Sequence, residues 1–222
     1  MSDNKLHHVE TDPVLKMKSW WQTNQKAVLT AVTVVVVIVG GWYAYKKYVS
    51  GPKEEQANLA IYPAEAYFRA DSFKLALNGD GPHKGVLYVL NNFSGTKAGN
   101  LAKYYAGVSY LKTGDFKNAA KYLEDFSTSA KQIQMMAYGA LGDAYSELGK
   151  NDDAVTNYKK ASETFESDEL NASEYLFRAG LLSETLGKTK EAVDIYKQLK
   201  TKFPATLRGR EADKYINRLS VE

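Results

Sequence analysis

Two small residues recur together along this chain, and their spacing constrains the fold more than any other feature. They are Gly107, Gly142 and Gly180 in the first set and Ala119, Ala154 and Ala192 in the second. The glycine intervals are 142 − 107 = 35 and 180 − 142 = 38 residues, and the alanines repeat both intervals. Two markers that move together are difficult to obtain by chance. A period of this length is typical of stacked helical hairpins.

Each repeat reads as a helix, a glycine turn and a second helix. Apolar and aromatic residues follow a three-to-four spacing, with small residues where two helices must approach closely. The repeats begin near Asn100, Met135 and Ser173. The pairs that end each first helix are Gly114-Asp115, Gly149-Lys150 and Gly187-Lys188, since glycine accepts the left-handed backbone found at helix ends.

The flanking segments complete an all-α prediction. Residues 56–93 read as an irregular opening hairpin whose second helix is Gly85–Phe93, with Pro63 as either a kink or a boundary. Asn78–Pro82 reads as a plain turn, because it lacks the further ligands of a calcium loop. Arg208–Leu219 predicts a capping helix.

Ala27–Tyr45 is a charge-free run of 19 residues. As a helix it would extend about 28 Å, close to the ~30 Å hydrocarbon core of a bilayer. Its valine run would suggest a strand in water, but a lone strand in lipid leaves its backbone unpaired, so a helix is predicted. Aromatic residues at both ends suit the headgroup regions: Trp20, Trp21, Trp42, Tyr43, Tyr45 and Tyr48. Bulky aromatics after Gly40-Gly41 weaken the alternative of a cleaved signal peptide.

Residues 1–26 are predicted to form a mobile tail. Residues 46–55 are predicted to form a linker, in which Gly51-Pro52 ends the membrane helix. The helical-repeat domain is predicted to occupy residues 56–222. Adjacent His7 and His8 read as solvated tail rather than a metal site. Three lysines flank each side of the span, so the positive-inside rule does not orient it. They are Lys16, Lys18 and Lys26 before it and Lys46, Lys47 and Lys53 after it.

Charge and composition argue against several functions. Residues 1–53 contain seven lysines and three acidic residues, a net charge of +4. Because the whole chain has a net charge of +3, the other 169 residues have a net charge of 3 − 4 = −1. This nearly neutral charge argues against nucleic-acid binding. Without cysteine, thiolate catalysis and cysteine metal sites are excluded. The sequence contains no phosphate loop, nucleophile elbow or HExxH helix. We therefore predict a non-enzyme without cofactor, metal or small-molecule substrate.

The repeats resemble tetratricopeptide repeats, most fully in the second: Tyr138, Leu141, Gly142, Tyr145, Ala154 and Tyr158. The plan of short tail, single span and small array resembles the YfgM-type ancillary subunits of the bacterial Sec translocon, and Gly79–Gly81 with Phe93–Gly107 resembles their Bacteroidetes branch. The resemblance implies an inner-membrane anchor with a cytoplasmic N-terminus and a periplasmic array. The implied partners are translocon components, periplasmic chaperones or emerging chains. A cytoplasm-facing adaptor that recruits soluble proteins is the alternative.

By family position, the concave face would be formed by the first helix of each repeat. Its candidate protein-binding residues are Tyr104, Val108, Leu111, Met136, Asp143, Glu147, Phe177, Leu181 and Glu184. Gly139 and Asp143 stand at two positions where a carboxylate clamp needs asparagine or lysine, which argues against such a clamp. The candidate face is aromatic and aliphatic with an acidic edge, which favours extended apolar or basic segments as ligands. The alternative is that Tyr104, Phe177 and Leu181 belong to the core between repeats.

Overall fold

The computed structural model describes residues 13–220 and forms two compact units, Met1–Pro52 and Lys53–Glu222. Within the described range all regular structure is helical, apart from one isolated antiparallel bridge between Gly79 and Lys84. The all-α prediction is confirmed. His7 and His8 lie outside the described residues.

The first unit contains α1 (Pro13–Tyr45) and a short π-helical turn, η1 (Lys46–Ser50). The predicted tail is wrong for residues 13–26, which are helical from Pro13 onward. Proline suits the first helical turn, where its missing N–H has no partner to lose. No residue of α1 is buried. One helical stretch, within Pro13–Arg69, is long and apolar enough to cross a membrane.

The predicted break at Gly51-Pro52 is also wrong. Gly51 has helical dihedral angles (φ −60°, ψ −56°), and helix α2 (Gly51–Arg69) begins there. Pro52 again lies in a first turn and is tolerated, and Pro63 lies inside α2 rather than at a boundary.

The opening of the second unit has three helices rather than a hairpin of two. These are α2, α3 (Phe73–Asn78) and α4 (Val86–Phe93), and they share a core with α5 (Lys97–Thr113). The Glu54 carboxylate accepts hydrogen bonds from the backbone N–H groups of Lys97 (2.8 Å) and Ala98 (3.3 Å). It thereby satisfies free donors at the start of α5.

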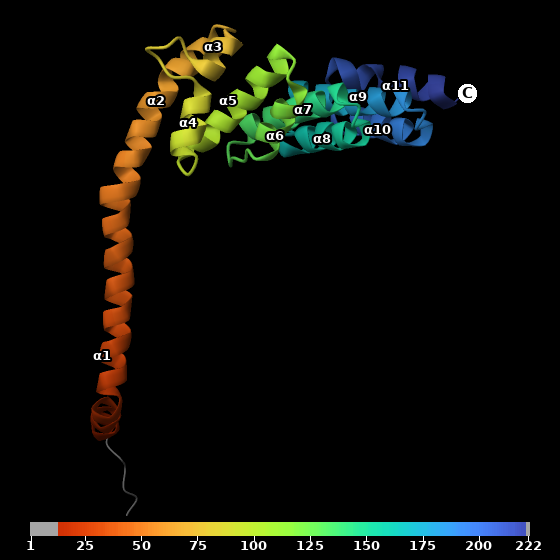
Figure 1. Cartoon of the computed structure of the whole chain (residues 1–222). Coiled ribbons are helices and arrows are strands. Elements are labelled where there is room, and N and C mark those ends of the chain that lie inside the picture. Colours follow the sequence, from red (N-terminus) through yellow and green to blue (C-terminus); the bar gives the residue numbers. More distant parts are fainter. Residues whose placement is uncertain (1–12, 221–222) are drawn as a thin grey trace, which may run out of the picture. The chain divides into compact units, whose positions relative to one another are not determined.

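Three hairpins and a final helix follow, and they form two layers (Figure 1). We call α5, α7, α9 and α11 the first helices and α6, α8 and α10 the second helices. The hairpins are α5 with α6 (Phe116–Glu124), α7 (Lys131–Glu147) with α8 (Asn151–Thr164), and α9 (Glu169–Thr185) with α10 (Thr189–Lys202); α11 is Leu207–Ser220.

The repeated glycines lie where first and second helices touch. A Cβ atom on Gly142 would lie 2.6 Å from Tyr158 Cε1, and one on Gly180 would lie 2.7 Å from Tyr196 Cε1. Gly107 stands in the same relation to Leu123, at 2.5 Å from Cγ. The three marker alanines are fully buried. The periodic small residues therefore lie where helices pack closely, as predicted.

Helix α11 begins as α5 does. Thr206 Oγ1 accepts a hydrogen bond from Gly209 N (3.0 Å), as Thr96 Oγ1 does from Gly99 N (2.9 Å). Helix α11 thus occupies the position of a first helix in the array. From Arg210 onward its exposed positions carry polar side chains, which agrees with the predicted cap, whereas Leu207 in the first turn is 59% exposed. The exposed polar residues are Arg210, Asp213, Lys214, Asn217, Arg218 and Ser220.

Candidate protein-binding site

Three of the predicted binding residues, Leu111, Asp143 and Glu147, line one cavity of about 490 Å³. Leu111 lies in the last turn of α5, and Asp143 and Glu147 lie one turn apart on α7. The other lining residues are Lys112, Gly114, Phe116, Ser146 and Tyr158. The cavity lies between the ends of two successive first helices; we call it the α5–α7 cavity.

Local backbone geometry forms one wall of this cavity. Gly114 adopts a left-handed conformation (φ 84°) that ends α5. Asp115 then caps α6, because its side chain accepts a hydrogen bond from Asn118 N at 3.2 Å. This tight turn places Phe116 at the start of α6, on the cavity wall.

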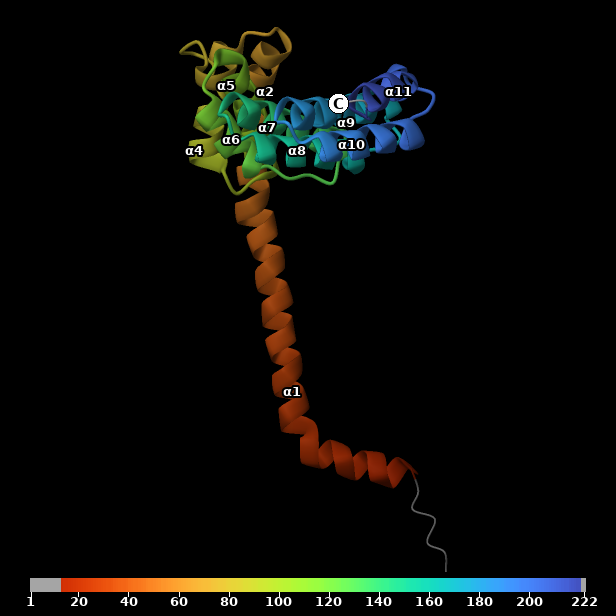
Figure 2. The ribbon, with the colours of Figure 1, turned by 90° about the vertical axis from the view of Figure 1, so that its right-hand side faces the viewer.

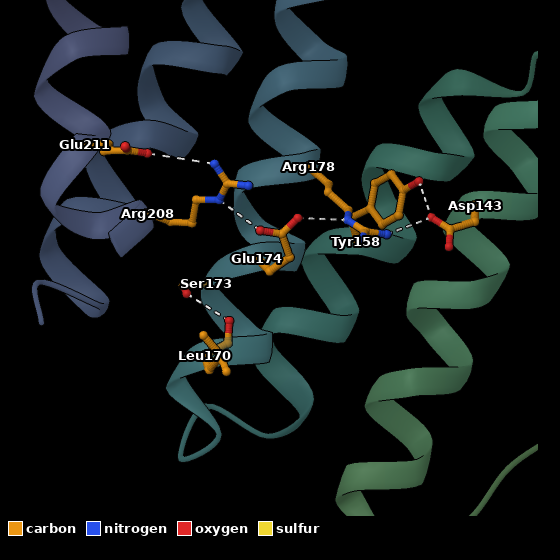
Figure 3. A network of polar contacts seen from close by, with 8 residues as sticks. All are labelled: Asp143, Tyr158, Leu170, Ser173, Glu174, Arg178, Arg208 and Glu211. Atoms are coloured by element: carbon orange, nitrogen blue, oxygen red, sulfur yellow. Dashed lines mark hydrogen bonds and ion pairs between the residues drawn. The ribbon is translucent and has the colours of Figure 1, made fainter. Parts of the chain in front are cut away.

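Asp143 is held by one of its two carboxylate oxygens. Tyr158 donates its hydroxyl proton to Asp143 Oδ1 (2.8 Å), and an Arg178 Nη1–H donates to the same oxygen (3.1 Å) (Figure 3). Asp143 Oδ2 accepts no hydrogen bond from any residue in the described range. Desolvation raises the pKa of the Tyr158 hydroxyl, and the charge of Asp143 raises it further. The tyrosine therefore remains a proton donor to Asp143 Oδ1.

The Arg178 contact continues as a chain of ion pairs across the first helices. Arg178 Nε donates to Glu174 Oε1 (3.2 Å), and Arg208 Nε on α11 donates to Glu174 Oε2 (2.9 Å) (Figure 3). Arg208 also lies 3.8 Å from Glu211. Desolvation lowers the pKa of Arg178, but Asp143 and Glu174 outweigh it and raise the pKa overall. These contacts connect α7, α9 and α11.

Glu184 on α9, like Asp143 on α7, accepts hydrogen bonds from a tyrosine and an arginine of other helices. Its carboxylate accepts hydrogen bonds from the Tyr196 hydroxyl (3.1 Å) and from Arg218 on α11 (2.6 Å). Burial is the main cause of the raised pKa of Tyr196, and the charge of the Glu184 carboxylate raises this pKa further. Each oxygen of Glu184 thus has a partner within the array, so this acid serves inter-helix packing.

Two of the predicted aromatic residues are core residues, which is the alternative that the sequence left open for them. Tyr104 is 8% exposed and packs against Phe126 (ring centroids 5.4 Å apart). Phe177 is 6% exposed, with Tyr215 at 5.2 Å and the Arg208 guanidinium carbon 4.0 Å from its ring centroid. Neither side chain is accessible to a partner.

The remaining predicted residues reach the surface to different degrees. Met136 and Leu181 are 44% and 43% exposed, and Glu147 is exposed. Val108 is half-buried against the core of the first two repeats. Leu181 is therefore accessible at the surface, whereas Tyr104 and Phe177 are buried.

Gly139, at a position where a carboxylate clamp needs asparagine or lysine, lies against the next repeat. A Cβ atom on Gly139 would lie 2.1 Å from Cε1 of Tyr175, a residue of α9. An asparagine at this position would collide with that ring. The glycine serves the packing of α7 against α9.

Sequence reasoning missed Lys112, Phe116, Arg178 and Arg208 as neighbours of the candidate residues. The repeat position of Tyr158 was visible in the sequence, but its hydrogen bond to Asp143 was not. Pairing between different helices depends on their axial register, which side-chain periodicity does not contain.

Other candidate chemistry is structural. His83 donates its backbone N–H to Asp80 Oδ1 (2.9 Å), and Tyr67 donates its hydroxyl proton to Oδ2 (2.7 Å). The Tyr67 hydrogen bond, with those from His83, lowers the pKa of Asp80 to about 2. This carboxylate closes the Asn78–Pro82 turn. Among the described residues, no group of three or more His, Asp or Glu side chains is arranged to hold a metal ion.

The fold defines a class of protein: a short α-solenoid built from helical hairpins. A family model described as a tetratricopeptide repeat-like domain matches residues 18–141, more than half of the 222 residues, and a tetratricopeptide repeat model matches 140–205. The chain belongs to the tetratricopeptide repeat-like family. The first match includes the apolar run 27–45. A comparison with curated proteins yields no match.

Tetratricopeptide repeats generally bind other proteins, and their families are typically non-catalytic. The chain is accordingly an interaction scaffold, and its described residues include a candidate membrane helix near the N-terminus.

Proposed function

We propose that this chain is a membrane-anchored interaction scaffold that faces the periplasm and assists proteins at or after Sec translocation. The periplasmic direction and the Sec-related role rest on the resemblance of the short tail, single span and small array to YfgM-type subunits. The docking role rests on one observation, the α5–α7 cavity with its partly unused acids.

The chemistry of this cavity favours a segment that carries basic and apolar side chains. Asp143 Oδ2 and the exposed Glu147 carboxylate provide acceptors for a lysine or arginine. The C-terminal ends of α5 and α7 add partial negative charge at the same place. Leu111 and Phe116 offer apolar contact. The positive charge of Lys112, which also lines the cavity, repels ligands with several cationic groups. A ligand segment with one basic residue next to an apolar residue therefore fits best.

Crosslinking in intact cells tests the docking site. A photo-reactive amino acid at Glu147 is expected to capture partners, whereas the same group at Glu163, an exposed glutamate of α8, captures markedly fewer. Glu147→Lys should reduce capture from a reactive group at Lys112, and the matched Glu163→Lys should not. Equal capture at both positions would place docking elsewhere.

The membrane topology distinguishes an array that faces the periplasm from one that faces the cytoplasm. Protease added to spheroplasts should digest the domain after Gly51 if the array faces the periplasm. If the domain stays intact while periplasmic control proteins are digested, the scaffold acts instead as a cytoplasm-facing adaptor. The crosslinking result is independent of this outcome.

A further inference from the structure

The first part of α1, residues 13–26, contains three lysines and no acidic residue. We call it the lysine–tryptophan segment. Its large apolar side chains lie in the open: Met17 is 67% exposed, Trp20 57% and Trp21 44%. No residue of α1 is buried, so no described part of the protein covers these side chains.

Helical spacing gives the segment two unlike faces. Met17, Trp20 and Trp21 stand at i, i+3 and i+4 and share one face. Lys16 and Lys18 flank that face on either side. The opposite face carries Ser19, Gln22 and Lys26, with Leu15 as its one large apolar residue. An apolar face with aromatic residues and lysine borders is typical of helices that lie in a membrane interface.

The shape of α1 agrees with this orientation. In Figure 2 the N-terminal part of α1 turns sharply away from the axis of the rest of the helix, and in Figure 1 that part is seen nearly end-on. Both parts belong to the unit that ends at Pro52. Side chains donate to backbone carbonyls in this region: Thr23 to Ser19 O (3.0 Å) and Asn24 to Trp20 O (2.9 Å). Hydroxyl bonds to the carbonyl four residues earlier often bend helices. Thr30 and Thr33 make the same bonds to Lys26 O (2.8 Å) and Leu29 O (2.8 Å), so these bonds are not specific to the turn.

The lysine–tryptophan segment continues directly into the run 27–45, so it meets the surface of any bilayer that this run spans. A helix that turns across the span axis lies along that surface, and about 20 Å of helix fits there. Indole rings favour the headgroup layer, and lysines near it are attracted to anionic lipids. We propose that residues 13–26 bind anionic phospholipid headgroups of the bilayer that α1 spans. The inference depends on neither the orientation nor the protein partner.

Energy transfer in vesicles tests the proposal. The full chain with Trp42→Phe keeps only Trp20 and Trp21 as tryptophan donors, because the chain has three tryptophans. It is reconstituted in vesicles of phosphatidylcholine and phosphatidylglycerol, with a dansyl group on the acyl chain of one lipid or the other. We expect at least about twofold more transfer to labelled phosphatidylglycerol, since one lysine near an anionic surface changes partition about fivefold. High salt should remove the preference.

Charge variants provide the matched control. Lys16→Gln with Lys18→Gln and Lys26→Gln should abolish the preference. Lys46→Gln with Lys47→Gln and Lys53→Gln, which removes the same charge beyond the span, should leave it unchanged. Equal transfer to both labelled lipids would overturn the proposal, as would iodide quenching of Trp20 and Trp21 to the extent seen for free tryptophan. The salt series requires no lysine substitution, so altered folding of the charge variants does not affect it.

Discussion

Phe177 and Leu181 lie one turn apart on α9, and both were predicted to bind a partner, yet their burial differs widely. Phe177 is 6% exposed and Leu181 is 43% exposed. Truncating each to alanine therefore tests whether the structure assigns them correctly to core and surface.

The cost of Phe177→Ala follows from what surrounds the ring. It packs against Tyr196 and Tyr215 (centroids 6.2 and 5.2 Å away) and beneath the Arg208 guanidinium. Removing a buried phenylalanine costs about 3–5 kcal/mol, because contacts are lost and a cavity remains. Leu181→Ala removes a side chain that is already partly hydrated, so we expect about 1 kcal/mol.

Urea unfolding of the full chain in nanodiscs, followed by circular dichroism at 222 nm, measures the difference. Tryptophan fluorescence is unsuitable because all three tryptophans lie in α1. For the 222 − 52 = 170 residues of the second unit, the Phe177→Ala loss corresponds to a decrease of about 6–20 °C in Tm. Wild-type stability in Phe177→Ala, or an equal loss in Leu181→Ala, would refute the core assignment.

Two further predictions concern polar contacts. Because the pKa of Asp80 falls from 3.8 to about 2 in the folded protein, its stabilising effect is complete above pH 4 and is lost as the pH falls toward 2. Wild type should therefore exceed Asp80→Asn in Tm at pH 6 and approach it at pH 2; a gap that widens on acidification would contradict the sign. The Asp143–Arg178 pair is partly exposed (38% and 41%), so a double-mutant cycle with Asp143→Asn and Arg178→Met should give a coupling of about 0.5–1 kcal/mol in urea unfolding. A coupling near zero would mean that this pair does not connect α7 to α9.

Several features of the fold could be predicted from the sequence because they depend on local chemistry. Gly149 and Gly187 end first helices with φ values of 72° and 70°, as expected for glycine in this position. The helix break at Gly51-Pro52 was predicted wrongly because the pair resembles a turn signal. Proline is tolerated in the first turn of a helix, and a sequence alone does not show where that turn starts.

The accessibility of the candidate site residues depends on tertiary packing more than the repeat fold does. Family position placed the candidate residues on the first helices α5, α7 and α9, and three of them line the α5–α7 cavity. It did not separate Tyr104 from Met136, since both occupy the same row while only the first is buried. Exposure depends on how far neighbouring hairpins rotate against one another, which no single helix encodes.

By itself, the sequence determined the helical-hairpin array and its period, because small residues recur wherever a first and a second helix approach most closely. It also determined the apolar run 27–45. Only the tertiary structure decided how the acids of the first helices are used. Glu184 has partners at both oxygens, whereas Asp143 keeps Oδ2 unpaired beside a cavity. Equivalent residue types thus receive different roles, because ion pairing across helices depends on distances that only the packed array establishes.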